Sequence, residues 1–150
     1  MRLFVGKDVR AVQAASINAP WNWNKGDATV MTQLEFIGGV VVNYFGSWVS
    51  QGAETSWNGD WRFEGSNGVL LWRQDGVFFS DKGTEMTPVP LVDFPVEHQA
   101  YLLEAFADAL DSGKEPETSG KRNLNSLATT YAVVKAARER RRVQVTELIK

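Results

Sequence analysis

The sequence has 150 residues, no cysteine, one histidine and six tryptophans, with 43% hydrophobic and 23% charged residues. These values fit one globular domain over residues 1–150. The lack of cysteine excludes disulfides and thiolate ligands, and the single His98 excludes a multi-histidine metal site. A net charge of −2 does not indicate nucleic acid or an anionic membrane as a partner. No apolar run is long enough to span a membrane and the first residues lack a secretory signal, so we expect a soluble, cytoplasmic protein.

The first part of the chain has the pattern of β-strands. Its segments are short, rich in β-branched and aromatic residues, and separated by turn residues. Gly38-Gly39 fits a tight turn between two strands, because glycine tolerates a positive φ. The expected strands are Val9–Ile17, Ala28–Phe36, Val40–Val49, Thr55–Glu64, Gly68–Trp72, Gly76–Ser80, Glu85–Val89 and, near the end of the chain, Arg142–Leu148.

Two helices are expected before the last strand. The first has Pro95 in its first turn, Gly113 just past its end, and apolar residues at helical spacing: Ala100, Leu103, Phe106, Ala107 and Leu110. The second has an apolar face made of Leu124, Leu127, Ala128, Tyr131 and Val134. Strands followed by helices predict an α+β fold, with an open, mostly antiparallel β-sheet and the helices packed on one face.

The segment Val40–Val49 is apolar on both of its strand faces. Val42 and Trp48 lie on one face, and Val41 and Phe45 lie on the other. An antiparallel strand with one face in water normally alternates between apolar and polar residues. Since two helices cover only one face of the sheet, we expect a second subunit on the other face and therefore a homo-oligomer.

Motifs for catalysis or cofactor binding are absent from the chain as given. The sequence contains no GxGxxG, GxxxxGK[ST] or GxSxG string. His98 has no serine or second acid near it in sequence, so a surface or helix-capping role is favoured over acid–base catalysis. We therefore assign no catalytic, cofactor-binding or metal-binding residue.

Two tryptophan-containing loops are the candidate ligand site. Aromatic faces stack on the C–H patches of sugars and polyols, while neighbouring polar side chains bind their hydroxyl groups. The candidate substrate-binding residues are Trp21, Asn22, Trp23, Lys25, Trp57 and Asn58. The alternative is that these tryptophans close the ends of the sheet or lie in a subunit interface.

Three segments resemble one family. Residues 57–68, WNGDWRFEGSNG, are similar to the WxGxWRIxGxxG segment of the Gfo/Idh/MocA oxidoreductases. Residues 106–116, FADALDSGKEP, resemble FxDAIRxGxxP, and residues 116–124, PETSGKRNL, resemble PxTSGxDNL. The order and spacing of these segments also match, and the similarity covers nearly the whole chain.

The resemblance implies a C-terminal substrate-binding and oligomerisation domain. Members of the family pair such a domain with an N-terminal Rossmann domain that binds NAD or NADP, and most act on sugars, inositols or other polyols. Their catalytic lysine belongs to an EKP motif, which this chain lacks. We therefore expect the chain to bind no cofactor by itself, to lack dehydrogenase activity alone, and to work with a Rossmann domain in a full-length parent or as a partner. The alternatives are a stand-alone carbohydrate-binding module and an oligomerisation module.

Overall fold

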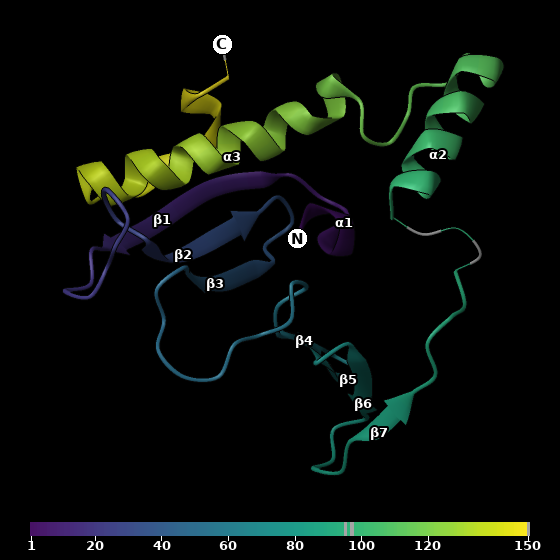
Figure 1. The fold of residues 1–150 in the computed structure, drawn as a ribbon, viewed down its shortest axis with the longest axis horizontal. Helices are drawn as coiled ribbons and strands as arrows, with labels where there is room; N and C mark the ends of the chain where they lie inside the picture. The colour runs from purple at the N-terminus through teal and green to yellow at the C-terminus, as the bar shows by residue number, and fades with distance from the viewer. Residues whose placement is uncertain (95, 97, 150) are drawn as a thin grey trace. The chain divides into compact units, whose positions relative to one another are not determined.

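The computed structural model describes residues 1–94, 96 and 98–149 (Figure 1). It divides into two compact units, described separately below. The first unit comprises Met1–Ser50 with Asp108–Lys150, and the second comprises Gln51–Ala107. Pro95, expected in the first turn of a helix, lies outside the described residues. Among the described helices, none is long and apolar enough to cross a membrane.

The first unit contains a four-stranded antiparallel sheet. Its order is β3 (Val41–Ser47), β2 (Thr29–Phe36), β1 (Val9–Ile17) and β8 (Val143–Gln144). The predicted strand Val9–Ile17 is confirmed. The predicted strand Ala28–Phe36 is one residue shorter at its start, and the predicted strand Val40–Val49 is shortened to Val41–Ser47. Gly38 and Gly39 form the predicted turn between β2 and β3, with φ angles of 97° and 90°. These are left-handed angles that glycine adopts without strain.

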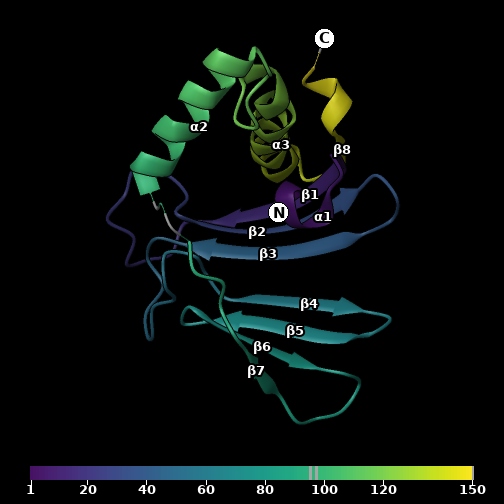
Figure 2. The ribbon, with the colours of Figure 1, turned by 90° about the vertical axis from the view of Figure 1, so that its right-hand side faces the viewer.

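The helix α3 (Gly120–Glu139) covers one face of this sheet (Figure 2). It buries a stripe of alanines at four-residue spacing: Ala128, Ala132 and Ala136. Their small side chains pack with Val12 and Phe36, which are fully buried in the sheet. The sequence pattern predicted a different face for this helix, and that prediction is wrong except for Ala128. The larger side chains of that face are exposed: Leu124, Leu127, Tyr131 and Val134.

The last predicted strand, Arg142–Leu148, is wrong beyond Gln144. The residues Val145–Glu147 form a 3₁₀ turn instead. The Glu147 carboxylate accepts the backbone N–H of Gln144 at 3.0 Å and the Lys135 ammonium at 2.8 Å. This capping interaction ends the strand, while Val143 and Val145 are still both buried.

The second unit is a meander of four antiparallel strands. The order follows the chain: β4 (Trp61–Gly65), β5 (Gly68–Arg73), β6 (Gly76–Ser80) and β7 (Thr87–Val89). The strand expected from Thr55 begins only at Trp61, because the residues before it form a turn with Gly59 at a φ of 73°. The α+β class with antiparallel strands is confirmed, and within the described residues the strands are grouped in two sheets of four.

Two further helices complete the described elements. The helix α1 (Arg2–Val5) is a single turn before β1. The helix α2 (His98–Ser112) crosses the limit between the two units and has no buried residue. His98 is its first residue and is exposed.

An ion-pair cluster joins β1, β2 and the end of the chain. The Glu35 carboxylate accepts Arg142 Nε at 2.6 Å and Arg10 Nη2 at 3.0 Å. The pKa of Glu35 is lowered from 4.5 to about 2, mainly by the hydrogen bond from Arg142 and, to a smaller extent, by the one from Arg10. Because the folded pKa is depressed, the stabilising effect of Glu35 is complete above pH 4.5 and is lost as the pH falls toward 2.

We expect the replacement Glu35→Gln to lower stability at pH 7 and to have little effect near pH 2. At pH 7 it removes a charged acceptor of two guanidinium groups, whereas near pH 2 the wild-type carboxyl is itself losing its charge. Urea unfolding of both proteins between pH 2 and 7 measures the difference. Glu54→Gln, at an exposed position in the second unit, is the matched control. A difference that is the same at every pH would contradict the proposed role of Glu35.

Candidate functional site

The loop between β1 and β2 carries four of the six predicted site residues. The Trp21 indole Nε1 donates to the backbone carbonyl of Val49 at 2.7 Å, which ties the loop to the segment after β3. Trp23 is 80% exposed, and Lys25 is also exposed. Trp23 and Lys25 therefore present an aromatic side chain and a cation to solvent.

Asn22 holds this loop together. Its Nδ2 group donates to Asn18 Oδ1 at 2.7 Å and to the carbonyl of Gly26 at 2.6 Å. Its Oδ1 accepts the backbone N–H of Asn24 at 2.8 Å. Both donor hydrogens and the carbonyl are thus used inside the loop. Asn22 therefore stabilises the conformation of the loop that carries Trp23.

The other two predicted residues precede β4 in the second unit. Trp57 is 95% exposed. The Asn58 Nδ2 group donates to Asp75 Oδ1 at 2.8 Å, and the Asn58 carbonyl accepts Trp61 Nε1 at 2.6 Å. Asn58 therefore links this loop to the turn between β5 and β6. The two tryptophan loops belong to different units, so their joint role as one wall stays a prediction.

Two further tryptophans pack within the sheet of the second unit. Trp61 and Trp72 are paired across β4 and β5, with ring centroids 6.4 Å apart. The Trp61 ring also stacks on Phe63 at 5.8 Å. All three are only partly exposed, and aromatic pairs of this kind stabilise neighbouring strands. Trp61 and Trp72 therefore pack against each other within this sheet.

The open face of the first unit is a site that the sequence located only in part. We use this name for the side of β1–β3 opposite α3. From the strand register its exposed or partly exposed residues are Gln13, Ala15, Ile17, Thr29, Met31, Gln33, Glu35, Val41, Asn43, Phe45 and Ser47. A hollow of about 600 Å³ on this face is lined in part by Gln33 and Phe45. Phe45 is 60% exposed, as the two apolar faces of its segment suggested.

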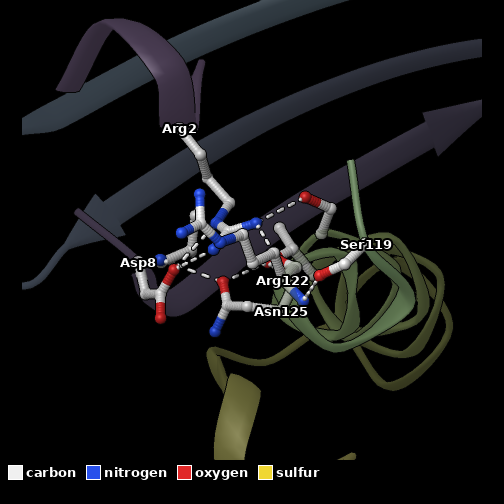
Figure 3. A network of polar contacts seen from close by, with 8 residues as sticks. Arg2, Asp8, Ser119, Arg122 and Asn125 are labelled. Atoms are coloured by element: carbon white, nitrogen blue, oxygen red, sulfur yellow. Dashed lines mark hydrogen bonds and ion pairs between the residues drawn. The ribbon is translucent and has the colours of Figure 1, made fainter. Parts of the chain in front are cut away.

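A polar network joins α1 to the start of α3 (Figure 3). The Arg2 guanidinium donates to Asp8 Oδ1 at 2.8 Å and to the Arg122 carbonyl at 2.8 Å. The Asn125 Oδ1 accepts the backbone N–H of Val9 at 3.3 Å, and the Ser119 hydroxyl caps α3 by accepting the Arg122 N–H at 3.2 Å. The network positions backbone segments, and no sequence pattern indicated that its residues form a group.

Comparison with known proteins finds likeness at the level of structure. No family model matches the chain, and no curated protein matches it in sequence. Three solved structures illustrate the structural matches. An aldose-aldose oxidoreductase from Caulobacter crescentus, complexed with glycerol, aligns with a TM-score of 0.79 and 20% identity over 95% of this chain. An oxidoreductase from Agrobacterium radiobacter, in complex with NAD⁺, L-tartaric acid and magnesium, aligns with a TM-score of 0.80 and 20% identity over 99% of this chain.

The third example is the WlbA dehydrogenase from Bordetella pertussis, in complex with NADH and UDP-GlcNAcA. It aligns with a TM-score of 0.69 and 18% identity over 91% of this chain. The fold of this chain is therefore that of one part of each of these three oxidoreductases. The chain spans less than half of these proteins, covering 43%, 46% and 40% of their lengths.

The segments that resemble Gfo/Idh/MocA proteins now have places in the structure. Residues 57–68 form the loop before β4, β4 itself and the turn to β5. Residues 106–116 contain the end of α2 and the connector that follows it. Residues 116–124 lead into α3, where Ser119 is the cap. In this chain the three segments thus mark a turn, a helix end and a helix start.

Proposed function

We propose that the chain is the substrate-binding and oligomerisation domain of an NAD(P)-dependent oxidoreductase that acts on a sugar or polyol. The supporting observation is the structural match over nearly the whole chain to part of each of three oxidoreductases. In this proposal a Rossmann domain, in the same parent protein or in a partner, supplies the NAD or NADP site. The cytoplasmic location stays a prediction.

The proposed substrate class has support from the exposed tryptophans. Trp23 and Trp57 are the most exposed tryptophans in the structure. Each follows or precedes an asparagine whose amide is hydrogen-bonded inside or beside the local loop, so the backbone that carries the indole is constrained. A loop that is ordered before binding loses less entropy when a ligand binds than a mobile loop does. Among the matched proteins, the Caulobacter crescentus enzyme is an aldose-aldose oxidoreductase.

We expect the replacement Trp23→Ala to weaken sugar binding about three- to tenfold, the range for loss of one aromatic stacking contact. The measurement is calorimetric titration of the chain with a panel of aldoses, inositols and short polyols. Trp48→Ala, a replacement of another exposed tryptophan outside the loop, is the matched control and should leave the affinity unchanged. Absence of binding by the wild-type chain to the whole panel would contradict the proposed substrate-binding role.

A stand-alone carbohydrate-binding module is the second candidate, because the same exposed tryptophans favour it. The two candidates differ in what lies beside the chain. A Rossmann segment with GxGxxG and EKP motifs, encoded in frame or next to this sequence, supports the oxidoreductase domain. Sugar binding without any such partner supports the module.

The open face supports the proposed oligomerisation role. Its central strand β2 carries Met31 and the neighbouring edge strand β3 carries Phe45, and both side chains are apolar, large and exposed. Its charged residue, Glu35, is already paired with Arg10 and Arg142. An exposed apolar surface with its charge confined to one end is typical of a protein–protein interface. We propose that a second copy of the chain covers this face, in a dimer or a tetramer.

A further inference from the structure

A row of three amide side chains crosses the open face. The strand register pairs Gln13 on β1 with Gln33 on β2, and Gln33 with Asn43 on β3. All three residues are exposed, and Gln33 Nε2 donates to Asn43 Oδ1 at 3.3 Å. Apolar side chains flank the row, with Ala15, Met31 and Phe45 on one side of it and Val41 on the other.

The chemistry of this row favours a second copy of the chain as its occupant. A carboxamide carries both donors and an acceptor, so a row of amides can pair with an identical row. A nucleic acid, an anionic membrane or an acidic peptide would need free cations. The cations that the structure pairs at this face, Arg10 and Arg142, are bonded to Glu35.

We propose that Gln13, Gln33 and Asn43 form a self-complementary amide row that sets the orientation in which two copies of the chain pair across the open face. This inference rests on the proposed oligomerisation role. Polar groups within an apolar interface penalise arrangements that leave them unpaired, so they select one register among several with similar apolar contact. The apolar residues supply the affinity, and the amides supply the specificity.

In a twofold-symmetric pair, Gln33, the central residue of the row, has a position that the two flanking residues do not share. A twofold axis between two facing sheets can run along the row or along the strands. If it passes through the middle of the row, Gln33 faces Gln33 of the second copy in both cases. The flanking Gln13 then faces either Gln13 or Asn43 of the second copy.

The replacement Gln33→Glu tests this arrangement in the full chain. It keeps the shape of the side chain but places two carboxylates opposite each other at pH 7. We expect self-association about 100-fold weaker at pH 7, with recovery below pH 4, where a protonated carboxyl can again donate. The other charged groups described at this face are Glu35, Arg10 and Arg142, which are present in both proteins. Gln51→Glu, in an exposed loop of the second unit, is the matched control and should associate like the wild type.

A single-cysteine variant gives an independent geometric test, because the chain has no other cysteine. Facing sheets pack about 10 Å apart, so a short bismaleimide should link Gln33→Cys to its copy efficiently. The variant Ser66→Cys, in the turn between β4 and β5, should give only background linkage.

The results of these two experiments distinguish the amide-row proposal from the proposed oligomerisation role. Sedimentation equilibrium provides the association constants. A wild-type oligomer whose affinity is unchanged in Gln33→Glu at pH 7, with Gln33→Cys still linked better than Ser66→Cys, overturns the amide row but leaves the open face as the interface. The same unchanged affinity with Gln33→Cys linked no better than Ser66→Cys overturns both. A wild-type chain that is monomeric throughout overturns both. A wild-type oligomer weakened by Gln33→Glu and linked at Gln33→Cys supports both.

Discussion

Replacing Phe36 by alanine should lower the free energy of unfolding by about 3–5 kcal/mol, the usual cost of removing a buried phenylalanine ring. Phe36 is fully buried at the end of β2. It packs with Leu34, Val9 and the alanine stripe of α3, so its removal leaves a cavity between the sheet and the helix. Globular domains have total stabilities of about 5–15 kcal/mol, so this single change removes a large share.

Urea unfolding followed by circular dichroism measures this loss, because α3 contributes most of the helical signal of the first unit. The control Phe106→Ala makes the same chemical change at an exposed position in α2. It should change the free energy of unfolding by about 0.5 kcal/mol or less. Equal destabilisation by the two variants would show that the core does not lie between β1–β3 and α3.

Replacing Phe45 by arginine should weaken self-association by about 100-fold or more, the largest effect that we expect outside the core. Phe45 is 60% exposed on the edge strand β3 of the open face, beside Met31. In a paired face it would become buried, and an arginine there would bring an unpaired charge into the interface. A buried charge without a partner costs several kcal/mol.

Light scattering over a concentration series measures this effect. Because Phe45 is exposed in the single chain, the variant should keep the circular dichroism spectrum of the wild type. Leu91→Arg adds the same charge at an exposed position in the second unit and serves as the control. If Phe45→Arg and Leu91→Arg both remain as associated as the wild type, the open face is not the interface.

The strands were predictable where their bounds are determined by alternating apolar residues and by turn residues close in sequence. The segments Val9–Ile17 and Gly76–Ser80 have their predicted bounds, and Gly38-Gly39 forms the predicted turn. Each of these depends on neighbouring residues alone. The last strand failed because its end depends on Glu147, whose carboxylate bonds the Gln144 N–H and turns the chain. A pattern of alternating valines does not contain that information.

The buried face of α3 was not predictable from apolar periodicity. The large side chains suggested one face, but the sheet is contacted by Ala128, Ala132 and Ala136. Which face packs depends on how closely the helix can approach the strands, and small residues permit the closest approach. The larger apolar side chains, such as Leu127 and Tyr131, remain exposed in this structure.

The sequence selected the residues of the candidate site, but it did not show which contacts they make. Sequence reasoning selected Trp21, Asn22 and Trp23 together as ligand contacts. The structure gives Trp21 a hydrogen bond to the distant Val49 carbonyl and gives Asn22 three bonds inside its loop. Of the predicted residues in that loop, Trp23 is the most exposed tryptophan, at 80%, and Lys25 is also exposed. Long-range bonds of this kind have no signature in a single sequence.

The mass of the wild-type chain in solution tests the central claim most directly, because that claim makes the open face an interface between copies. Light scattering at micromolar concentration should give a dimer or a larger multiple of 16.7 kDa. A mass of 16.7 kDa across the micromolar range would contradict the proposed oligomerisation role.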